Sequence, residues 1–200
     1  MWDGERRSVS ISTGKERLMS EENRKAIRIS VRNLVEFVLR SGDIDNRRSG
    51  NAQKDAMLAG GRIHRKIQKR MGSGYRAEVP LKHEVQDEEQ EITLLVEGRA
   101  DGIFTENGIP VIDEIKGMYT DISRLEEPIE VHLAQAMCYG YFYCCDKDLD
   151  GIRLQMTYCN LETEEIKDSR PTAREKSWRH GFPAWFTNTL SGRGTSTTMS

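Results

Sequence analysis

The middle of the chain contains three segments in which apolar and polar residues alternate, at residues 77–85, 91–104 and 109–117. Alternation with a period of two is typical of strands that bury one face. The dipeptide Asn107-Gly108 separates the last two segments and is a strong signal for a two-residue hairpin turn. The centre of this chain is therefore predicted to be an antiparallel sheet.

Helical patterns lie on both sides of these strands. Ser30 is predicted to cap a helix with apolar residues at Val31, Leu34, Val35, Val38 and Leu39. A second helix is expected from about Asp55 to Met71, with Met57, Leu58, Ile63 and Ile67 as its apolar stripe. Residues 130–145 are typical of a largely buried helix, and residues 151–167 return to strand with a turn near residues 160–164. We expect an α/β domain with a mixed central β-sheet flanked by helices.

Length and composition indicate one soluble globular domain. The chain has 200 residues, 36% hydrophobic and 31% charged. It contains no run of 18 apolar residues and its N-terminal region lacks the apolar core of a secretory signal, so we expect a cytoplasmic protein with no membrane partner. We predict a flexible leader over residues 1–25, the domain over 26–168 and a poorly ordered, atypical tail over 169–200.

Cysteine usage favours free thiols. The four cysteines are Cys138, Cys144, Cys145 and Cys159, and no two of them have the CxxC spacing of a metal site. Three of them lie in or beside one apolar helical segment. We therefore expect buried thiols and no iron–sulfur cluster.

A net charge of −2 conceals an uneven distribution of charge. Between residues 47 and 76 the chain carries nine basic residues against the single acid Asp55, and between residues 84 and 130 acids dominate. The basic residues are Arg47, Arg48, Lys54, Arg62, Arg65, Lys66, Lys69, Arg70 and Arg76. A basic arm beside an acidic body suits a protein that holds a polyanion near a cation-binding centre. A solvated helix face explains the same charges equally well.

The segment VIDEIKG, residues 111–117, places charged residues in a strand that begins as core. If Asn107-Gly108 forms the turn, Asp101 lies opposite Glu114 on one sheet face, and alternation places Lys116 on that face too. Two adjacent carboxylates repel unless one is protonated or a cation binds, and Mg²⁺ or Mn²⁺ with oxygen ligands meets that need.

The chain has a second Glu-Ile-Lys, and the first copy has an alternative explanation. The second Glu-Ile-Lys, at residues 165–167, has no opposed aspartate and is expected to be an exposed strand end. The alternative for the first copy is a surface ladder of ion pairs among Asp101, Glu114, Lys116 and Arg99.

The pattern D-(x)12-E-x-K across a hairpin resembles the PD-(D/E)xK nuclease superfamily. His132, Gln135 and Tyr139 in HLAQAMCY resemble the Q-x-x-x-Y helix of its RecB-like branch, and His64 in GRIHRKI resembles the upstream histidine of that branch. The match spans roughly residues 29–167 and implies a restriction-endonuclease-like core. SVRNLVEFVLRSGDID and MTYCNLETEEIK also resemble an N-terminal nuclease domain of bacterial XPD/DinG-like helicases.

The resemblance implies a metal site and catalytic residues. Asp101 and Glu114 would bind the metal together with the carbonyl of Ile115, and His64 would add an imidazole ligand that favours Mn²⁺ over Mg²⁺. Lys116 would position the attacking water and stabilise charge in the transition state.

It also implies contacts with nucleic acid. Gln135 and Tyr139 would orient their helix and contact substrate phosphate or base. The basic residues expected to hold the backbone are Arg62, Arg65, Lys66 and Lys69.

The function so implied is a Mg²⁺- or Mn²⁺-dependent deoxyribonuclease that leaves 5′-phosphates, acts in DNA repair or recombination, and takes DNA that is single-stranded or has free ends. A helicase domain or subunit is the implied partner, because the sequence contains no GxxxxGK[ST] phosphate loop. Two other interpretations stay open: a non-catalytic nucleic-acid-binding module of a helicase complex, and a protein-interaction domain with a structural ion-pair ladder.

Overall fold

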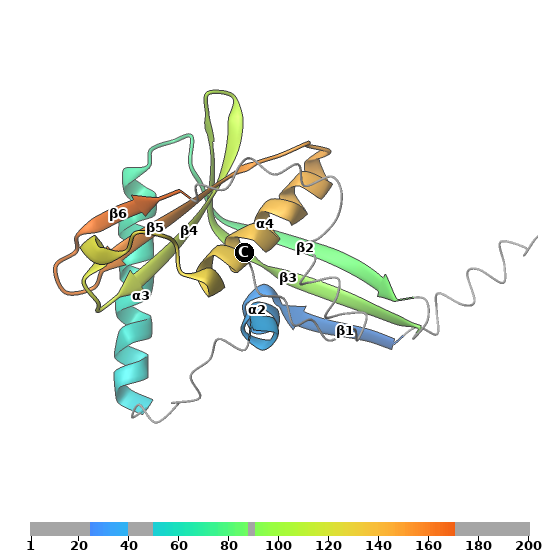
Figure 1. The fold of residues 1–200 in the computed structure, drawn as a ribbon, viewed down its shortest axis with the longest axis horizontal. Helices are drawn as coiled ribbons and strands as arrows, with labels where there is room; N and C mark the ends of the chain where they lie inside the picture. The colour runs from blue at the N-terminus through green and yellow to red at the C-terminus, as the bar shows by residue number, and fades with distance from the viewer. Residues whose placement is uncertain (1–24, 40–49, 88–90, 171–200) are drawn as a thin grey trace, which may run out of the picture.

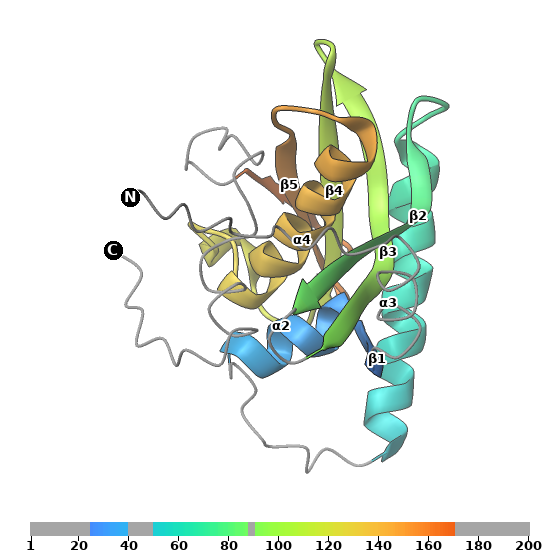
Figure 2. The ribbon, with the colours of Figure 1, turned by 90° about the vertical axis from the view of Figure 1, so that its right-hand side faces the viewer.

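The computed structural model describes residues 25–39, 50–87 and 91–170. In chain order the elements are β1 (Lys25–Ser30), α2 (Val31–Leu39), α3 (Gly50–Arg70), β2 (Arg76–Asp87), β3 (Ile92–Glu106), β4 (Ile109–Met118), the 3-10 helix η1 (Ile122–Arg124), α4 (Glu130–Lys147), β5 (Arg153–Asn160) and β6 (Ile166–Ser169). The strands form one mixed sheet, with α3 against one face and α2 and α4 against the other (Figure 1, Figure 2). The predicted α/β class, a mixed sheet flanked by helices, is confirmed.

The long strand β3 organises the sheet. Strands β3, β4, β5 and β6 lie in that order, with β4 and β5 parallel and the other two pairs antiparallel. Strand β2 pairs with β3 from Ile92 to Ile103 along one edge. On the opposite edge, β1 covers Ile92 to Glu97 and β4 covers Gly102 to Glu106. Residues 98–101 of β3 therefore face a gap between β1 and β4.

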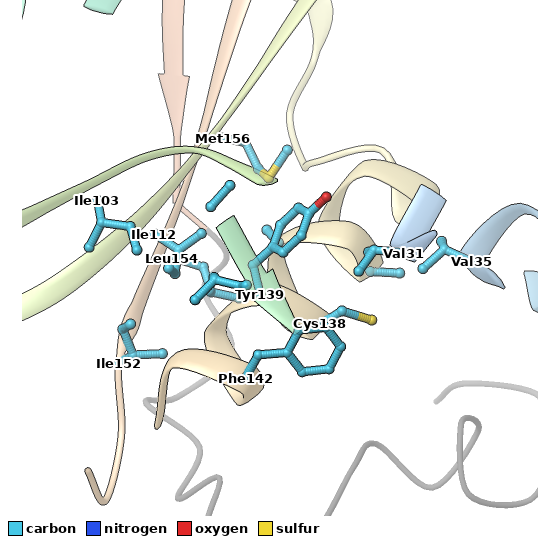
Figure 3. Packing of buried hydrophobic residues seen from close by; sticks show 14 of the residues in the cluster. Val31, Val35, Ile103, Ile112, Cys138, Tyr139, Phe142, Ile152, Leu154 and Met156 are labelled. Carbon is cyan, nitrogen blue, oxygen red and sulfur yellow. The ribbon is translucent and has the colours of Figure 1, made fainter. Parts of the chain in front are cut away.

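Two apolar cores hold the layers together. The larger one fills the space between the sheet and the helices α2 and α4, and Figure 3 shows its centre. Its labelled members are Val31, Val35, Ile103, Ile112, Cys138, Tyr139, Phe142, Ile152, Leu154 and Met156. On the other face, Ile63 and Ile67 of α3 pack against Ile115 and Cys159. Burying each such side chain contributes about 1.5–3 kcal/mol, so these contacts fix where α3 and α4 lie relative to β4.

The local signals in the sequence hold in most places. Asn107 and Gly108 both have positive φ, at 53° and 78°, as a type I′ hairpin turn requires. The hydroxyl of Ser30 accepts a hydrogen bond from the Asn33 N–H at 3.1 Å and caps α2. Helix α3 begins at Gly50, earlier than expected, and includes the glycine pair at 60–61 without interruption.

Some expectations were wrong. Leu58 is 71% exposed and is not part of the apolar stripe of α3; Met57 lies outside the residues whose side chains are described. Strand β1 was not predicted, because its first four side chains are all exposed and give no buried alternation.

The second Glu-Ile-Lys lies at the start of β6: Glu165 precedes the strand, and Ile166, its first residue, is exposed as predicted. The ammonium of Lys167 donates to the backbone carbonyls of Ser123 and Leu125, at 2.9 and 2.6 Å, so this copy holds η1 in place. Its lysine has a structural role.

The cysteines are free in the structure, and all but the exposed Cys145 are buried. Within the described residues no helix is long and apolar enough to cross a membrane. Strand β1 begins at Lys25, and Arg170 binds Glu106 through two hydrogen bonds of 2.7 and 2.9 Å. The rest of the predicted leader and tail, residues 1–24 and 171–200, lies outside the described residues.

Candidate functional site

The β3–β4 ladder ends beside the predicted site. Its register is the predicted one, from the pair Glu106 and Ile109 to the pair Gly102 and Asp113. The next pair would be Asp101 and Glu114, but the backbone pairing stops before it. Instead, the Asp101 carboxylate accepts a hydrogen bond from the Ile115 N–H at 2.8 Å. The predicted register is therefore correct, but the ladder ends one pair before Asp101 and Glu114, because the Asp101 side chain takes the place of a backbone partner.

Strand β3 also changes phase at Asp101. Val96 and Ala100 face the larger core, as alternation requires, but Ile103 faces it too. Gly102 faces the opposite side, where a Cβ would overlap the ring of Tyr75. The interruption turns Asp101 toward α3, whereas Glu114 and Lys116 share the face of Ile112 and α4. The site therefore lies beside the gap between β1 and β4, where groups from α3 on one face of the sheet and from α4 on the other can reach it.

His64 on α3 is the nearest basic partner of Asp101. Its Nδ1 lies 3.2 Å from Oδ1 of Asp101, and both side chains are largely buried. Burial alone lowers the pKa of His64, but the hydrogen bond and charge of Asp101 outweigh it, so the pKa lies above its usual value. One helical turn further on, Gln68 donates to the Asp101 carbonyl at 3.0 Å and to Glu78 at 3.2 Å.

Glu78 on β2 joins these residues and was missed in the sequence. Ligand atoms of His64, Glu78 and Asp101 all lie within 4.8 Å of one another. Glu78 and Asp101 hold facing positions between the paired residues of β2 and β3, and neither has a ladder partner in the other strand. Glu78 has a φ of 52°, in the left-handed region that a glutamate rarely adopts. Strand alternation in the sequence does not indicate that β2 leaves regular pairing at Glu78.

Glu114 and Lys116 form a buried pair on the other side of the gap. Their side chains are in contact at 2.7 Å, and the ammonium also donates to Oε1 of Gln135 on α4 at 2.9 Å. Glu114 is only 3% exposed. Burial raises the pKa of Glu114 to about 7, with Lys116 opposing this rise and Asp101 adding to it.

The burial of Glu114 excludes a surface ladder of ion pairs. Arg99, the other member of that alternative, lies 4.0 Å from Glu78 and not beside Glu114. The four members of that ladder thus belong to three groups: Asp101 lies with His64, Glu114 with Lys116, and Arg99 near Glu78.

Helix α4 carries the predicted residues His132, Gln135 and Tyr139. Gln135 contacts Lys116 directly. Tyr139 is buried, and a Cβ on Gly98 would lie 2.6 Å from its hydroxyl, so glycine is needed there for the tyrosine to reach into the gap. Nδ1 of His132 is buried and has no hydrogen-bond partner among the described residues. Burial, with smaller effects from Lys116 and Arg32, lowers the pKa of His132 to about 4.

The residues present fit a divalent ion. One imidazole and two carboxylates, from His64, Glu78 and Asp101, form a donor set suited to Mn²⁺ or Mg²⁺. Oε2 of Glu114 is buried without a hydrogen-bond partner in the described part of the chain, and a cation would satisfy it. Glu114 is not in the converging group, so its assignment as a ligand, like that of the Ile115 carbonyl, stays a prediction.

The predicted nucleic-acid contacts divide into two sets. Arg65 and Lys69 are exposed on α3. Arg62 and Lys66 instead face Glu164 in the β5–β6 turn: Lys66 forms a hydrogen bond to it, and Arg62 lies 3.8 Å away. The basic surface of α3 is thus partly neutralised by the protein itself.

Asp113 points to the opposite face of β4 from Glu114 and is not one of the converging ligand groups. Its carboxylate accepts hydrogen bonds from the Tyr75 hydroxyl at 2.8 Å and the Thr157 hydroxyl at 2.6 Å. Asp113 is fully buried, and burial raises its pKa although both hydrogen bonds lower it. These hydrogen bonds tie β4 to Tyr75 and to Thr157 of β5.

No family model and no curated protein sequence matches the chain. Fifteen solved chains match it in fold, among them the crystal structure of SSO0001. That structure has a TM-score of 0.48 and 16% sequence identity, over 90% of this chain and 84% of the other. The similarity concerns the backbone arrangement alone.

Proposed function

We propose that the protein is a nuclease of the RecB-like PD-(D/E)xK kind, which uses Mg²⁺ or Mn²⁺ to hydrolyse phosphodiester bonds in DNA. The observation that supports this most directly is the convergence of His64, Glu78 and Asp101 within 4.8 Å, beside a lysine held by Glu114. A structural ion-pair ladder would not need an imidazole and a strained glutamate directed at one point.

A divalent ion at this position would polarise a phosphoryl oxygen and make a water molecule more acidic. Lys116 is the residue best placed to act on the substrate. An ammonium has three N–H donors, and the described contacts of Lys116 use two, with Glu114 and Gln135. The third can hold an attacking water or a non-bridging phosphate oxygen. Because Glu114 and Gln135 fix the ammonium in advance, little reorganisation is needed when charge develops.

The charges of α3 suit the backbone of a nucleic acid. Arg65 and Lys69 are exposed on the helix that carries His64, so they lie along one approach to the site. Such contacts are salt-dependent and independent of sequence. The resemblance to nuclease domains of helicases supports a helicase domain or subunit as the partner that supplies unwound DNA during repair or recombination.

The test is cleavage of labelled single-stranded DNA, blunt duplex and closed circular DNA with Mn²⁺, with Mg²⁺ and with chelator. We expect metal-dependent cleavage that Asp101→Asn and Lys116→Met reduce by at least about a hundredfold, the loss typical of one electrostatic catalytic group. The chain offers a matched control, Lys167→Met in the second Glu-Ile-Lys, which should lower stability through the loss of its bonds to Ser123 and Leu125 but leave cleavage by the folded protein unchanged. DNA binding without cleavage in either metal would overturn the nuclease proposal and favour the non-catalytic module.

A further inference from the structure

The carboxylate of Glu164, in the turn between β5 and β6, lies against basic side chains of α3. Its Oε2 accepts a hydrogen bond from Lys66, and its Oε1 lies 3.8 Å from a guanidinium nitrogen of Arg62. Arg70 adds a further attraction, and these contacts, chiefly that with Lys66, hold the pKa of Glu164 below its usual range. Arg62, Lys66 and Arg70 recur at four-residue intervals, so they form one stripe of the helix.

The β5–β6 turn is built to place this carboxylate. The Asn160 side chain accepts hydrogen bonds from the N–H groups of Glu162 and Thr163, at 2.8 and 3.0 Å. The Glu164 N–H donates to the Asn160 carbonyl at 2.9 Å. Glu164 itself has a φ of 57°, a conformation that the turn imposes. The fold thus holds one anion against a set of cationic donors.

We propose that Arg62, Lys66 and Arg70 form a subsite for a backbone phosphate of DNA, and that Glu164 is the internal anion which this phosphate displaces. The inference rests on the proposed function for the identity of the ligand. A carboxylate and a phosphate accept hydrogen bonds from the same donors, so a stripe that binds one also binds the other. The side chains of Lys66 and Glu164 are each 39% exposed, so water and a competing anion can reach the pair.

The subsite lies on the same helix as His64 but on a different face of it. The stripe is about 12 Å long at 1.5 Å per helical residue, and Lys66 is two residues from His64. Ile63 and Ile67 pack against the sheet on the part of α3 that lies between His64 and the basic stripe. Exchange of Glu164 for a phosphate therefore needs movement of side chains only.

The experiment measures binding of a fluorescent single-stranded oligonucleotide in chelator, across a salt series. We expect Glu164→Gln to bind about three- to tenfold more tightly at low salt. The matched control is Glu165→Gln, which removes the same charge from the next residue, an exposed one. Equal tightening by both variants would overturn the subsite.

A double-variant cycle separates displacement from general repulsion. In a background of Arg62→Gln and Lys66→Gln, the added Glu164→Gln change should have no effect on affinity; an unchanged gain there overturns the proposal. Thermal unfolding of each variant verifies that it is folded. The result is independent of catalysis, because no metal is present. Wild-type protein that binds no DNA at any salt concentration overturns the DNA proposal itself, whereas wild-type binding with no gain from Glu164→Gln overturns this inference alone.

Discussion

The carboxylate of Asp101 serves as the backbone partner of Ile115: its Oδ2 accepts the Ile115 N–H at 2.8 Å, where a strand carbonyl would otherwise do so. Its other oxygen faces His64 at 3.2 Å. One side chain therefore closes the end of the β3–β4 ladder and joins the sheet to α3. A change at Asp101 should affect both folding and chemistry, and the two effects are separable.

Replacing Asp101 with alanine and with asparagine should separate them. Asp101→Ala leaves the largely buried Ile115 N–H without its acceptor, which costs about 1–3 kcal/mol of the free energy of unfolding. Asp101→Asn keeps an acceptor oxygen and should retain most of that stability. Both variants should lose metal-dependent cleavage. Urea denaturation in chelator and the nuclease assay give the two readouts, and equal stability of the two variants would contradict the role given to this hydrogen bond.

Metal binding should stabilise the protein through Glu78. A ligand at a hundredfold excess over its Kd adds about 2.7 kcal/mol to the free energy of unfolding. Glu78→Gln removes one of three converging ligand groups and should weaken Mn²⁺ binding about tenfold, which reduces that gain by about 1.4 kcal/mol. Thermal unfolding over a Mn²⁺ titration measures this shift. Glu84→Gln, also on β2 but outside the converging group, is the control and should behave as wild type.

Gln135 should act by positioning Lys116. Gln135→Leu preserves a similar volume on α4 but removes the acceptor that lies 2.9 Å from the ammonium. We expect kcat to fall about tenfold or more with KM nearly unchanged, because the lysine remains paired with Glu114 but is less well oriented. Steady-state kinetics in Mn²⁺ test this. A rise in KM with unchanged kcat would instead indicate that Gln135 contacts the substrate.

The sequence was most informative where local rules determine structure. The Asn107-Gly108 turn predicted the register of the β3–β4 hairpin, and the apolar stripes predicted that His64 and Gln135 lie on helices near it. What no local rule contains is the interruption at Asp101. Alternation alone places Asp101 and Glu114 on one face, but the phase change turns Asp101 toward α3.

Glu78 was missed for the same reason. In AEVPLKHEV it reads as an ordinary solvent-facing strand residue, and its approach to His64 depends on a left-handed backbone conformation in β2. The partial neutralisation of α3 was also not visible, since Lys66 and Glu164 are 98 residues apart. Both features depend on tertiary packing, which alternation and helical spacing do not report.

The partly buried His132 should make stability depend on pH. Its folded-state pKa of about 4 lies below the unfolded value of 6.5, so between these values the unfolded chain binds a proton that the folded protein does not. Stability from this group is complete above pH 6.5 and is lost as the pH falls toward 4. The slope is at most about 1.4 kcal/mol per pH unit.

His132→Gln provides the test, since it cannot titrate. The difference in the free energy of unfolding between wild type and variant should change between pH 7 and pH 5, with the wild type losing more stability. His64 has a raised pKa and contributes with the opposite sign, but it is present in both proteins and cancels in the difference. A difference independent of pH would show that folding does not lower the pKa of His132.

Tyr75 should support β4 without taking part in metal binding. Tyr75→Phe keeps the ring that covers Gly102 but removes the hydroxyl that lies 2.8 Å from the buried Asp113 carboxylate. Losing a hydrogen bond to a charged group costs about 1.5–3 kcal/mol, and Asp113 keeps only its bond to Thr157 among those described here. We expect a lower urea midpoint, with an unchanged Mn²⁺ affinity because Tyr75 contributes none of the converging ligand atoms. Tyr119→Phe removes the same hydroxyl from a side chain that is 52% exposed and should change stability by less than about 0.5 kcal/mol. If Tyr75→Phe weakens Mn²⁺ binding as strongly as Glu78→Gln does, the Asp113 network belongs to the metal centre and its separation from that centre is wrong.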